Sequence, residues 1–224
     1  MKLYQIQFKQ EGDSLGKIIL EKQRSMAKLP GVRKTLAYYF TQPVVGFLAR
    51  TGISPSAITL FGFLVTVGAA ALINTGHLFA AGFVVLVAGL FDMLDGALAR
   101  HTNRVTRFGA FLDSTIDRLA EAVLLVSILF LYAKEQSVTP VLLACGALVG
   151  SFLVSYIRAR TEALGLEGQV GLFTRPERVV VLALGLLLNH VFDALIIALA
   201  IIMVLSFLTA GQRLINVWQQ AKIK

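Results

Sequence analysis

Long apolar stretches constrain this chain more than any other feature of its sequence. Hydrophobic residues make up 56% of the 224 residues and charged residues only 15%, which is too apolar for a soluble domain of this length. A helix that crosses the hydrocarbon core of a bilayer needs about 20 consecutive apolar residues. Six stretches approach or exceed that length, at 56–76, 78–99, 108–133, 138–160, 176–191 and 192–212. We therefore expect an all-α, polytopic membrane protein with six transmembrane helices.

The distribution of positive charge predicts how these helices are oriented. Of the 21 Lys and Arg residues, only Lys134 falls in a connection on the opposite side from all the others. The others precede the first stretch, flank the second and fourth connections, or follow the last stretch. By the positive-inside rule these parts face the cytoplasm. We expect a multi-pass protein of the plasma membrane with both termini in the cytoplasm, and an even number of spans fits this arrangement.

The chain divides by composition into three regions. Residues 33–50 have basic ends with aromatic residues between them, which is typical of an amphipathic helix lying in the membrane interface. We expect a cytoplasmic N-terminal arm and interfacial helix over 1–50, a six-helix membrane domain over 51–218, and a cytoplasmic tail over 219–224.

Four aspartates lie in or beside the second and third apolar stretches, where an ionised carboxylate costs several kcal/mol unless something compensates it. Asp92 and Asp95 are three residues apart, and Asp113 and Asp117 are four apart, so each pair projects from one face of its helix. An antiparallel hairpin centred on 104–105 would bring the two pairs to the same depth. Four converging carboxylates repel one another. Their hard oxygen ligands suit Mg²⁺, Mn²⁺ or Ca²⁺, and two ions would be a natural arrangement.

Three other interpretations of these aspartates remain open at this point. Intramembrane acids also occur in cation or proton transporters, although Asp193 is the only other carboxylate we find deep in the remaining spans. A non-catalytic membrane scaffold is a further alternative. Ordinary structural ion pairs would need nearby arginines, and four are close in sequence: Arg100, Arg104, Arg107 and Arg118.

The spacing of these residues resembles the complete signature of the CDP-alcohol phosphotransferase family. Every fixed position is met in Asp92-x2-Asp95-Gly96-x2-Ala99-Arg100-x8-Gly109-x3-Asp113-x3-Asp117. The resemblance covers roughly residues 45–215. It implies a six-helix enzyme, usually a homodimer, with a polar cavity open to the cytoplasm, membrane lipids as its surroundings and no nucleic acid among its partners.

The resemblance also implies roles for individual residues. The four aspartates would hold two divalent ions, Mg²⁺ or Mn²⁺, against the pyrophosphate of a CDP-linked lipid donor, and Asp117 would be the general base for the acceptor hydroxyl. The small side chains of Gly96 and Ala99 would leave room for the cytidine and ribose. The residues expected around the nucleotide are Thr59, Asp95, Gly96, Ala99, Arg100 and Gly109.

Arginines near the fourth connection bear on the acceptor. Arg158, Arg160, Arg175 and Arg178 flank one loop, where they would make a basic pocket, and arginine binds phosphate through paired N–H donors. The stretch resembles the bacterial phosphatidylinositol-phosphate synthases and their archaeal ether-lipid counterparts, whose acceptor is inositol phosphate. Glycerol 3-phosphate is the alternative acceptor. On this resemblance the acceptor-site residues are Ser155, Arg158, Arg160, Pro176, Arg178 and, more loosely, Arg213.

Overall fold

The computed structural model describes residues 44–166, 168 and 170–223. Residues 44–51 are helical and belong to an N-terminal unit that is described separately from the rest of the chain. Most of the interfacial helix predicted at 33–50 falls outside the described residues. The remainder of the chain, from Gly52 onward, forms one compact unit, and it contains all the predicted site residues.

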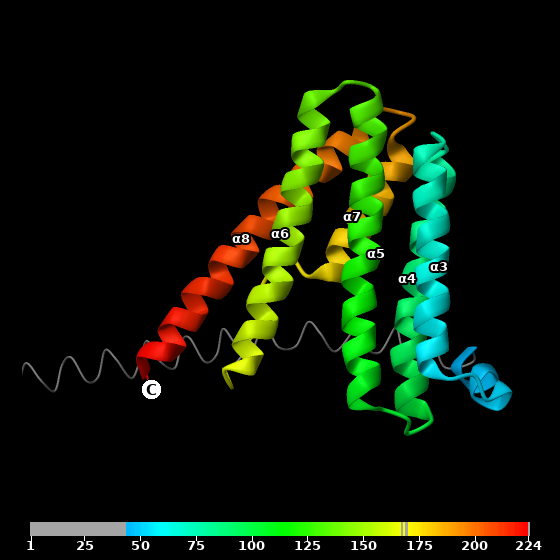
Figure 1. The fold of residues 1–224 in the computed structure, drawn as a ribbon, viewed down its shortest axis with the longest axis vertical. Coiled ribbons are helices and arrows are strands. Elements are labelled where there is room, and N and C mark those ends of the chain that lie inside the picture. The colour runs from blue at the N-terminus through cyan, green and yellow to red at the C-terminus, as the bar shows by residue number, and fades with distance from the viewer. Residues whose placement is uncertain (1–43, 167, 169, 224) are drawn as a thin grey trace, which may run out of the picture. The chain divides into compact units, whose positions relative to one another are not determined.

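The unit from Gly52 onward is built from helices, and its described residues contain no strand (Figure 1). The all-α prediction is therefore confirmed for this part of the chain. The helices are α3 (Pro55–Asn74), α4 (Leu78–His101), α5 (Arg107–Lys134), α6 (Val138–Ala163), α7 (Arg175–Leu188) and α8 (Ala194–Ile223).

Four of these helices, α3, α4, α6 and α8, are long and apolar enough to cross a membrane. Only 22% of the most apolar part of α4 is buried inside the protein, so most of this apolar helix needs surroundings as apolar as lipid. α5 is long but carries charged residues through its first half. α7 has 14 residues, which is about 21 Å of helix. The structure supports a helical membrane protein, and the count of six spans stays a prediction.

Polar caps define where the helices of the site begin. The Ser54 hydroxyl accepts from the Ala57 N–H at the start of α3, and the Thr106 hydroxyl accepts from the Gly109 N–H at the start of α5. Thr174 begins α7 with a capping box, in which threonine and a glutamate three residues later satisfy exposed backbone N–H groups. In Figure 1 the start of α7 lies about half-way up the bundle, whereas α6 ends near its lower edge.

The six helices pack in a closed ring, in the order α3, α4, α7, α8, α6, α5 and back to α3. Small residues permit the closest contacts: a Cβ added at Gly185 of α7 would lie 2.5 Å from the Ala198 Cβ of α8. α4 and α5 are consecutive in the chain but are not a closely packed pair, since each packs against α3. The predicted hairpin is therefore open, and side chains rather than backbones meet between its two helices.

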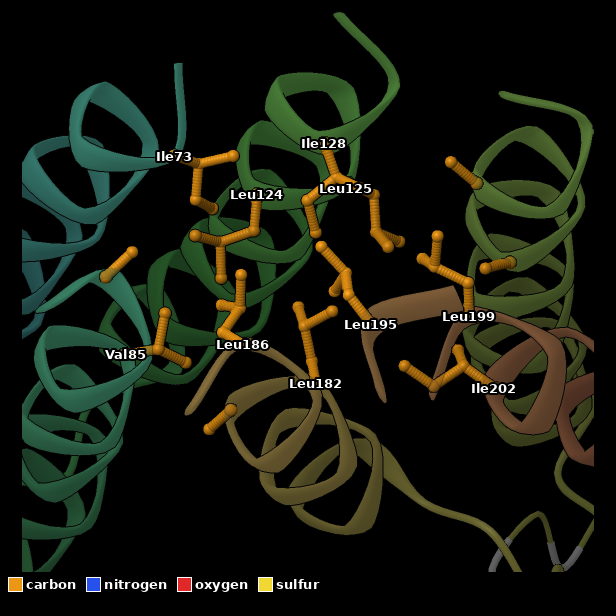
Figure 2. Close-up of a cluster of buried hydrophobic side chains, with 14 of the residues drawn as sticks. Ile73, Val85, Leu124, Leu125, Ile128, Leu182, Leu186, Leu195, Leu199 and Ile202 are labelled. Atoms are coloured by element: carbon orange, nitrogen blue, oxygen red, sulfur yellow. The ribbon is translucent and has the colours of Figure 1, made fainter. Parts of the chain in front are cut away.

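A hydrophobic core fills the bundle on the side away from the α4–α5 connection (Figure 2). All six helices contribute to it, and the aspartates lie nearer the α4–α5 connection. The labelled core side chains are Ile73, Val85, Leu124, Leu125, Ile128, Leu182, Leu186, Leu195, Leu199 and Ile202.

Candidate active site

Carboxylates from α4 and α5 meet in the space between these helices. Asp92, Asp95 and Asp113 each offer one oxygen, and the three oxygens all lie within 4.8 Å of one another. Asp95 is 4% exposed, and the other two are half-buried. The spacing of three places Asp92 and Asp95 on one face of α4, and α5 supplies the third acid from across the gap. Three hard oxygen donors at this separation suit a divalent cation such as Mg²⁺ or Mn²⁺.

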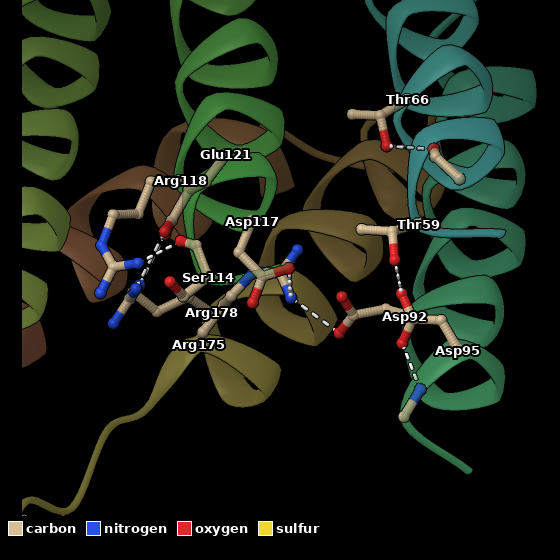
Figure 3. Close-up of polar contacts among 12 residues, drawn as sticks. Thr59, Thr66, Asp92, Asp95, Ser114, Asp117, Arg118, Glu121, Arg175 and Arg178 are labelled. Carbon is tan, nitrogen blue, oxygen red and sulfur yellow. Dashed lines mark hydrogen bonds and ion pairs between the residues drawn. The ribbon is translucent and has the colours of Figure 1, made fainter. Parts of the chain in front are cut away.

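The fourth aspartate of the signature, Asp117, is not part of this three-oxygen group and instead forms an ion pair with an arginine. Arg175 is the first residue of α7, and its Nη1 lies 2.8 Å from Asp117 Oδ1 and 2.7 Å from Asp92 Oδ2 (Figure 3). The structure thus brings three of the four predicted carboxylates into one group and links the fourth to that group through a guanidinium. The sequence placed Arg175 in a basic loop but did not indicate this contact.

Asp95 is fixed by two hydrogen bonds from its surroundings. The Thr59 hydroxyl of α3 donates to Asp95 Oδ2 at 2.6 Å, and the Gly96 backbone N–H donates to the other oxygen. Thr59, expected near the nucleotide, therefore directly contacts a carboxylate of the acidic group. The Arg100 guanidinium lies against Gly96, where an added Cβ would be 3.3 Å from its Nη1. Ala99 is half-buried one turn of α4 beyond Asp95.

A buried ion pair lies one turn beyond Asp117. Arg178 Nε is 2.6 Å from Glu121 Oε1, and Arg178 Nη2 is 2.9 Å from Glu121 Oε2. The two residues are 2% and 7% exposed, and Arg178 Nη1 has no hydrogen-bond partner within the described residues. Glu121 was not among the residues predicted from the sequence. Its signal was present, because Asp113, Asp117 and Glu121 recur every four residues along one face of α5.

The other predicted acceptor residues lie on α6, α7 and α8. Arg213 of α8 is 5% exposed and donates from Nε to the Val170 carbonyl and from Nη1 to the Val154 carbonyl, at 2.7 and 2.6 Å. Arg158 forms an exposed 2.8 Å ion pair with Glu162. The last three lie at the surface or half-buried: Ser155, Arg160 and Pro176.

The arginines that the sequence offered as structural partners for the aspartates are Arg100, Arg104, Arg107 and Arg118. Arg118 donates to the Ser114 carbonyl of its own helix. No ion pair joins any of the four to the signature aspartates in the part of the chain that the structure describes.

A cavity of about 260 Å³ connects the acidic group with the buried ion pair. Its polar lining comes from α3, α4, α5 and the first turn of α7. Apolar residues such as Gly62, Val85 and Leu182 line the part that faces the core. The polar lining residues include Thr59, Asp92, Asp95, Asp117, Glu121, Arg175 and Arg178. Carboxylates and guanidinium groups of one cavity can bind a cation and a phosphate side by side.

Comparison with known proteins identifies the class to which this site belongs. The family model described as CDP-alcohol phosphatidyltransferase matches residues 52–210. The chain belongs to the CDP-alcohol phosphatidyltransferase family. The family and the enzyme class expected from the signature are thereby confirmed, in place of a transporter or a scaffold.

The similar proteins narrow the activity within this family. The phosphatidylinositol phosphate synthase of Mycobacterium tuberculosis is 38% identical over 203 residues, covering 86% of this chain and 92% of that protein. The archaetidylinositol phosphate synthase of Methanothermobacter thermautotrophicus is 36% identical over 203 residues, covering 87% and 100%. These relatives indicate phosphatidylinositol phosphate synthase activity.

Crystal structures of the M. tuberculosis enzyme share the fold. The structure with CDP-DAG bound has a TM-score of 0.74 at 37% identity, covering 80% of this chain and 93% of that one. The structure in complex with manganese and citrate has a TM-score of 0.72, covering 80% and 88%. The second of these contains a divalent cation of the kind that the carboxylates of α4 and α5 suit.

Proposed function

We propose that this enzyme is a phosphatidylinositol phosphate synthase. It transfers the phosphatidyl group of a CDP-activated lipid, CDP-diacylglycerol or an ether analogue, to a hydroxyl of inositol phosphate and releases CMP. One observation carries the proposal: a group of carboxylates that suits divalent cations shares a cavity with the buried Arg178, whose Nη1 has no hydrogen-bond partner among the residues that the structure describes. The carboxylate group with its cations fits a diphosphate donor, and the arginine fits a phosphorylated acceptor.

The acidic side chains would hold two divalent ions, Mg²⁺ or Mn²⁺. Asp92, Asp95 and Asp113 would together supply ligands to the two ions. Asp117 would become a further ligand when an ion replaces Arg175 as the partner of its carboxylate. When bound, such ions neutralise negative charge on the phosphoryl oxygens and on the leaving phosphate. The hydrogen bonds from Thr59 and the Gly96 backbone to Asp95 would hold that carboxylate in place while ligands exchange.

Asp117 would act as the general base of the transfer. The acceptor oxygen forms a bond to the phosphorus that carries the lipid, the bond from that phosphorus to the CMP oxygen breaks, and the hydroxyl proton passes to the Asp117 carboxylate. An alcohol needs such a base because its own pKa is far above neutral pH. Asp117 is suited to the role since its carboxylate lines the cavity and its ion pair with Arg175 holds it there.

The remaining signature residues would contact the substrates. Arg178 and Arg213 are the buried arginines that would bind the acceptor phosphate, while the more exposed acceptor residues would guide its entry. The proposed donor-site residues are Thr59, Asp95, Gly96, Ala99, Arg100 and Gly109. The proposed acceptor-site residues are Ser155, Arg158, Arg160, Pro176, Arg178 and Arg213.

We further propose the membrane arrangement that the charge distribution predicts. All six helices of the unit would cross the plasma membrane. Because α7 is short, the loop before it would enter the bundle and complete that crossing. The active site and both termini would face the cytoplasm. The N-terminal arm with its interfacial helix would occupy 1–50, the membrane domain 51–218 and the tail 219–224. The enzyme would work as a homodimer.

A panel of acceptors tests the proposed reaction. Purified enzyme is incubated with CDP-diacylglycerol, Mg²⁺ and either inositol phosphate, glycerol 3-phosphate or free inositol, and released CMP is measured. The proposal predicts rapid release with inositol phosphate and little with free inositol, which lacks the phosphate that the arginines would bind. Release with glycerol 3-phosphate but not inositol phosphate would replace the proposed acceptor. No release with any of the three would refute the proposed reaction.

A further inference from the structure

Glu121 lies outside the family signature, yet it is the most buried acid of the row on α5. It follows Asp117 by four residues, so both side chains face the cavity from the same side of the helix. A carboxylate in an apolar helix is costly unless it is paired. Glu121 is paired with Arg178 through two short contacts, and both residues are more than nine-tenths buried.

The contact with Glu121 uses only one edge of the Arg178 guanidinium. Arginine carries five N–H donors in a plane. Glu121 takes the edge formed by Nε and Nη2, so both N–H groups of Nη1 and the second N–H of Nη2 remain. Nη1 is buried and has no hydrogen-bond partner in the described part of the chain. Leaving a buried donor in this state is unfavourable, and a bound anion would relieve that cost.

We infer that Glu121 is a positioning residue of the acceptor subsite. By holding the Nε–Nη2 edge, it fixes Arg178 so that the Nη1–Nη2 edge can bind two oxygens of the acceptor phosphate. Arg178 and Asp117 line the same cavity, so a phosphate on this edge places the rest of the acceptor toward the proposed base. Glu121 acts through Arg178 and does not touch the substrate. The inference rests on the proposed function, because it assigns Arg178 to the acceptor.

The test compares Michaelis constants for the two substrates in the purified full-length enzyme. Glu121→Gln keeps the shape but puts an N–H group against the N–H edge of Arg178. We expect the KM for inositol phosphate to rise about tenfold, as for the loss of one hydrogen bond to a charged group, while the KM for CDP-diacylglycerol stays within about twofold. Glu135→Gln is the matched control, since this exposed glutamate is the C-cap residue that follows the same helix. Equal changes in both constants, or no change in either, would overturn the inference.

Two further variants keep the test decisive. Glu121→Asp retains the charge with a shorter reach, so its acceptor KM should fall between those of wild type and Glu121→Gln. If Glu121→Gln does not fold, Glu121→Asp carries the comparison, and an unchanged acceptor KM would then overturn the inference. In Arg178→Lys, which lacks the planar edge, adding Glu121→Gln should raise the acceptor KM no further. An additive rise would show that Glu121 acts independently of Arg178.

The inference and the proposed function fail in different ways. If wild-type enzyme releases no CMP with inositol phosphate, the proposed acceptor is wrong, and the comparison is made with glycerol 3-phosphate, which presents the same phosphate group. If wild-type enzyme is active and Glu121→Gln leaves the acceptor KM unchanged, only the positioning role is wrong.

Discussion

Replacing Arg175 by glutamine should destabilise the protein in the absence of divalent ions. Arg175 Nη1 contacts both Asp92 and Asp117, so its single positive charge attracts both carboxylates and offsets part of the repulsion between them. Glutamine can hydrogen-bond to one of them but supplies no charge. The two acids would then face each other with their repulsion uncompensated.

The size of the effect follows from the burial of the three side chains. Removing one partner of a fully buried ion pair costs about 3–5 kcal/mol. The side chains of Arg175, Asp117 and Asp92 are 22%, 21% and 32% exposed, so water relieves part of that penalty. We therefore expect the low end, about 3 kcal/mol, which for a protein of this size lowers the apparent Tm by about 6–12 °C.

Thermal unfolding of the detergent-purified protein, with and without Mg²⁺, measures both parts of the prediction. Mg²⁺ should raise the apparent Tm of Arg175→Gln more than that of wild type, because the ion supplies the missing positive charge and stabilises the state that binds it. Arg158→Gln is the control, since its exposed pair with Glu162 contributes at most about 0.5 kcal/mol. An apparent Tm equal to wild type without Mg²⁺, or an equal response to Mg²⁺, would refute the reasoning.

Two other substitutions test the proposed base and the helix packing. Asp117→Asn should lower kcat at least about 100-fold, as expected for loss of a general base, with the KM for CDP-diacylglycerol little changed; a kcat within tenfold of wild type would remove Asp117 from that role. Gly185→Ala should lower the apparent Tm by overpacking the α7–α8 contact, where the new Cβ would lie 2.5 Å from the Ala198 Cβ, at a cost of about 1–3 kcal/mol. Gly211→Ala on α8 is its control, since nothing lies within 4 Å of a Cβ there, and equal melting of the two variants would contradict the packing.

Much of the fold could be predicted because apolar length and helical spacing are local properties of the sequence. The six stretches correspond to α3 through α8, and the predicted ends of the first four lie within three residues of the observed ones. The turn between the last two stretches was predicted to similar accuracy, since α7 ends at Leu188 and α8 begins at Ala194, where Asn189, His190 and Asp193 interrupt the apolar residues. The end of the last stretch was not predicted, because α8 continues to Ile223 through residues that are no longer predominantly apolar.

The site was predictable where spacing along one helix determines it and not where two helices must be placed relative to each other. The spacing of Asp92 and Asp95 indicated a shared face of one helix. It could not indicate that Arg175, more than 80 residues away, contacts Asp92, because that contact depends on α7 beginning inside the bundle. Nor could it indicate that α4 and α5 are separated by a cavity, which depends on both packing against α3.

Direct measurement of Mn²⁺ binding tests the central claim, that carboxylates of α4 and α5 together form a divalent-cation site. Electron paramagnetic resonance can follow free Mn²⁺ during titration of the purified enzyme. Asp113→Asn removes the ligand that α5 contributes, and Asp193→Asn changes an exposed aspartate before α8. We predict that Asp113→Asn weakens binding at least about tenfold, because cation affinity depends on the number of charged ligands, while Asp193→Asn binds as wild type does. Unchanged Mn²⁺ affinity in Asp113→Asn would contradict the account.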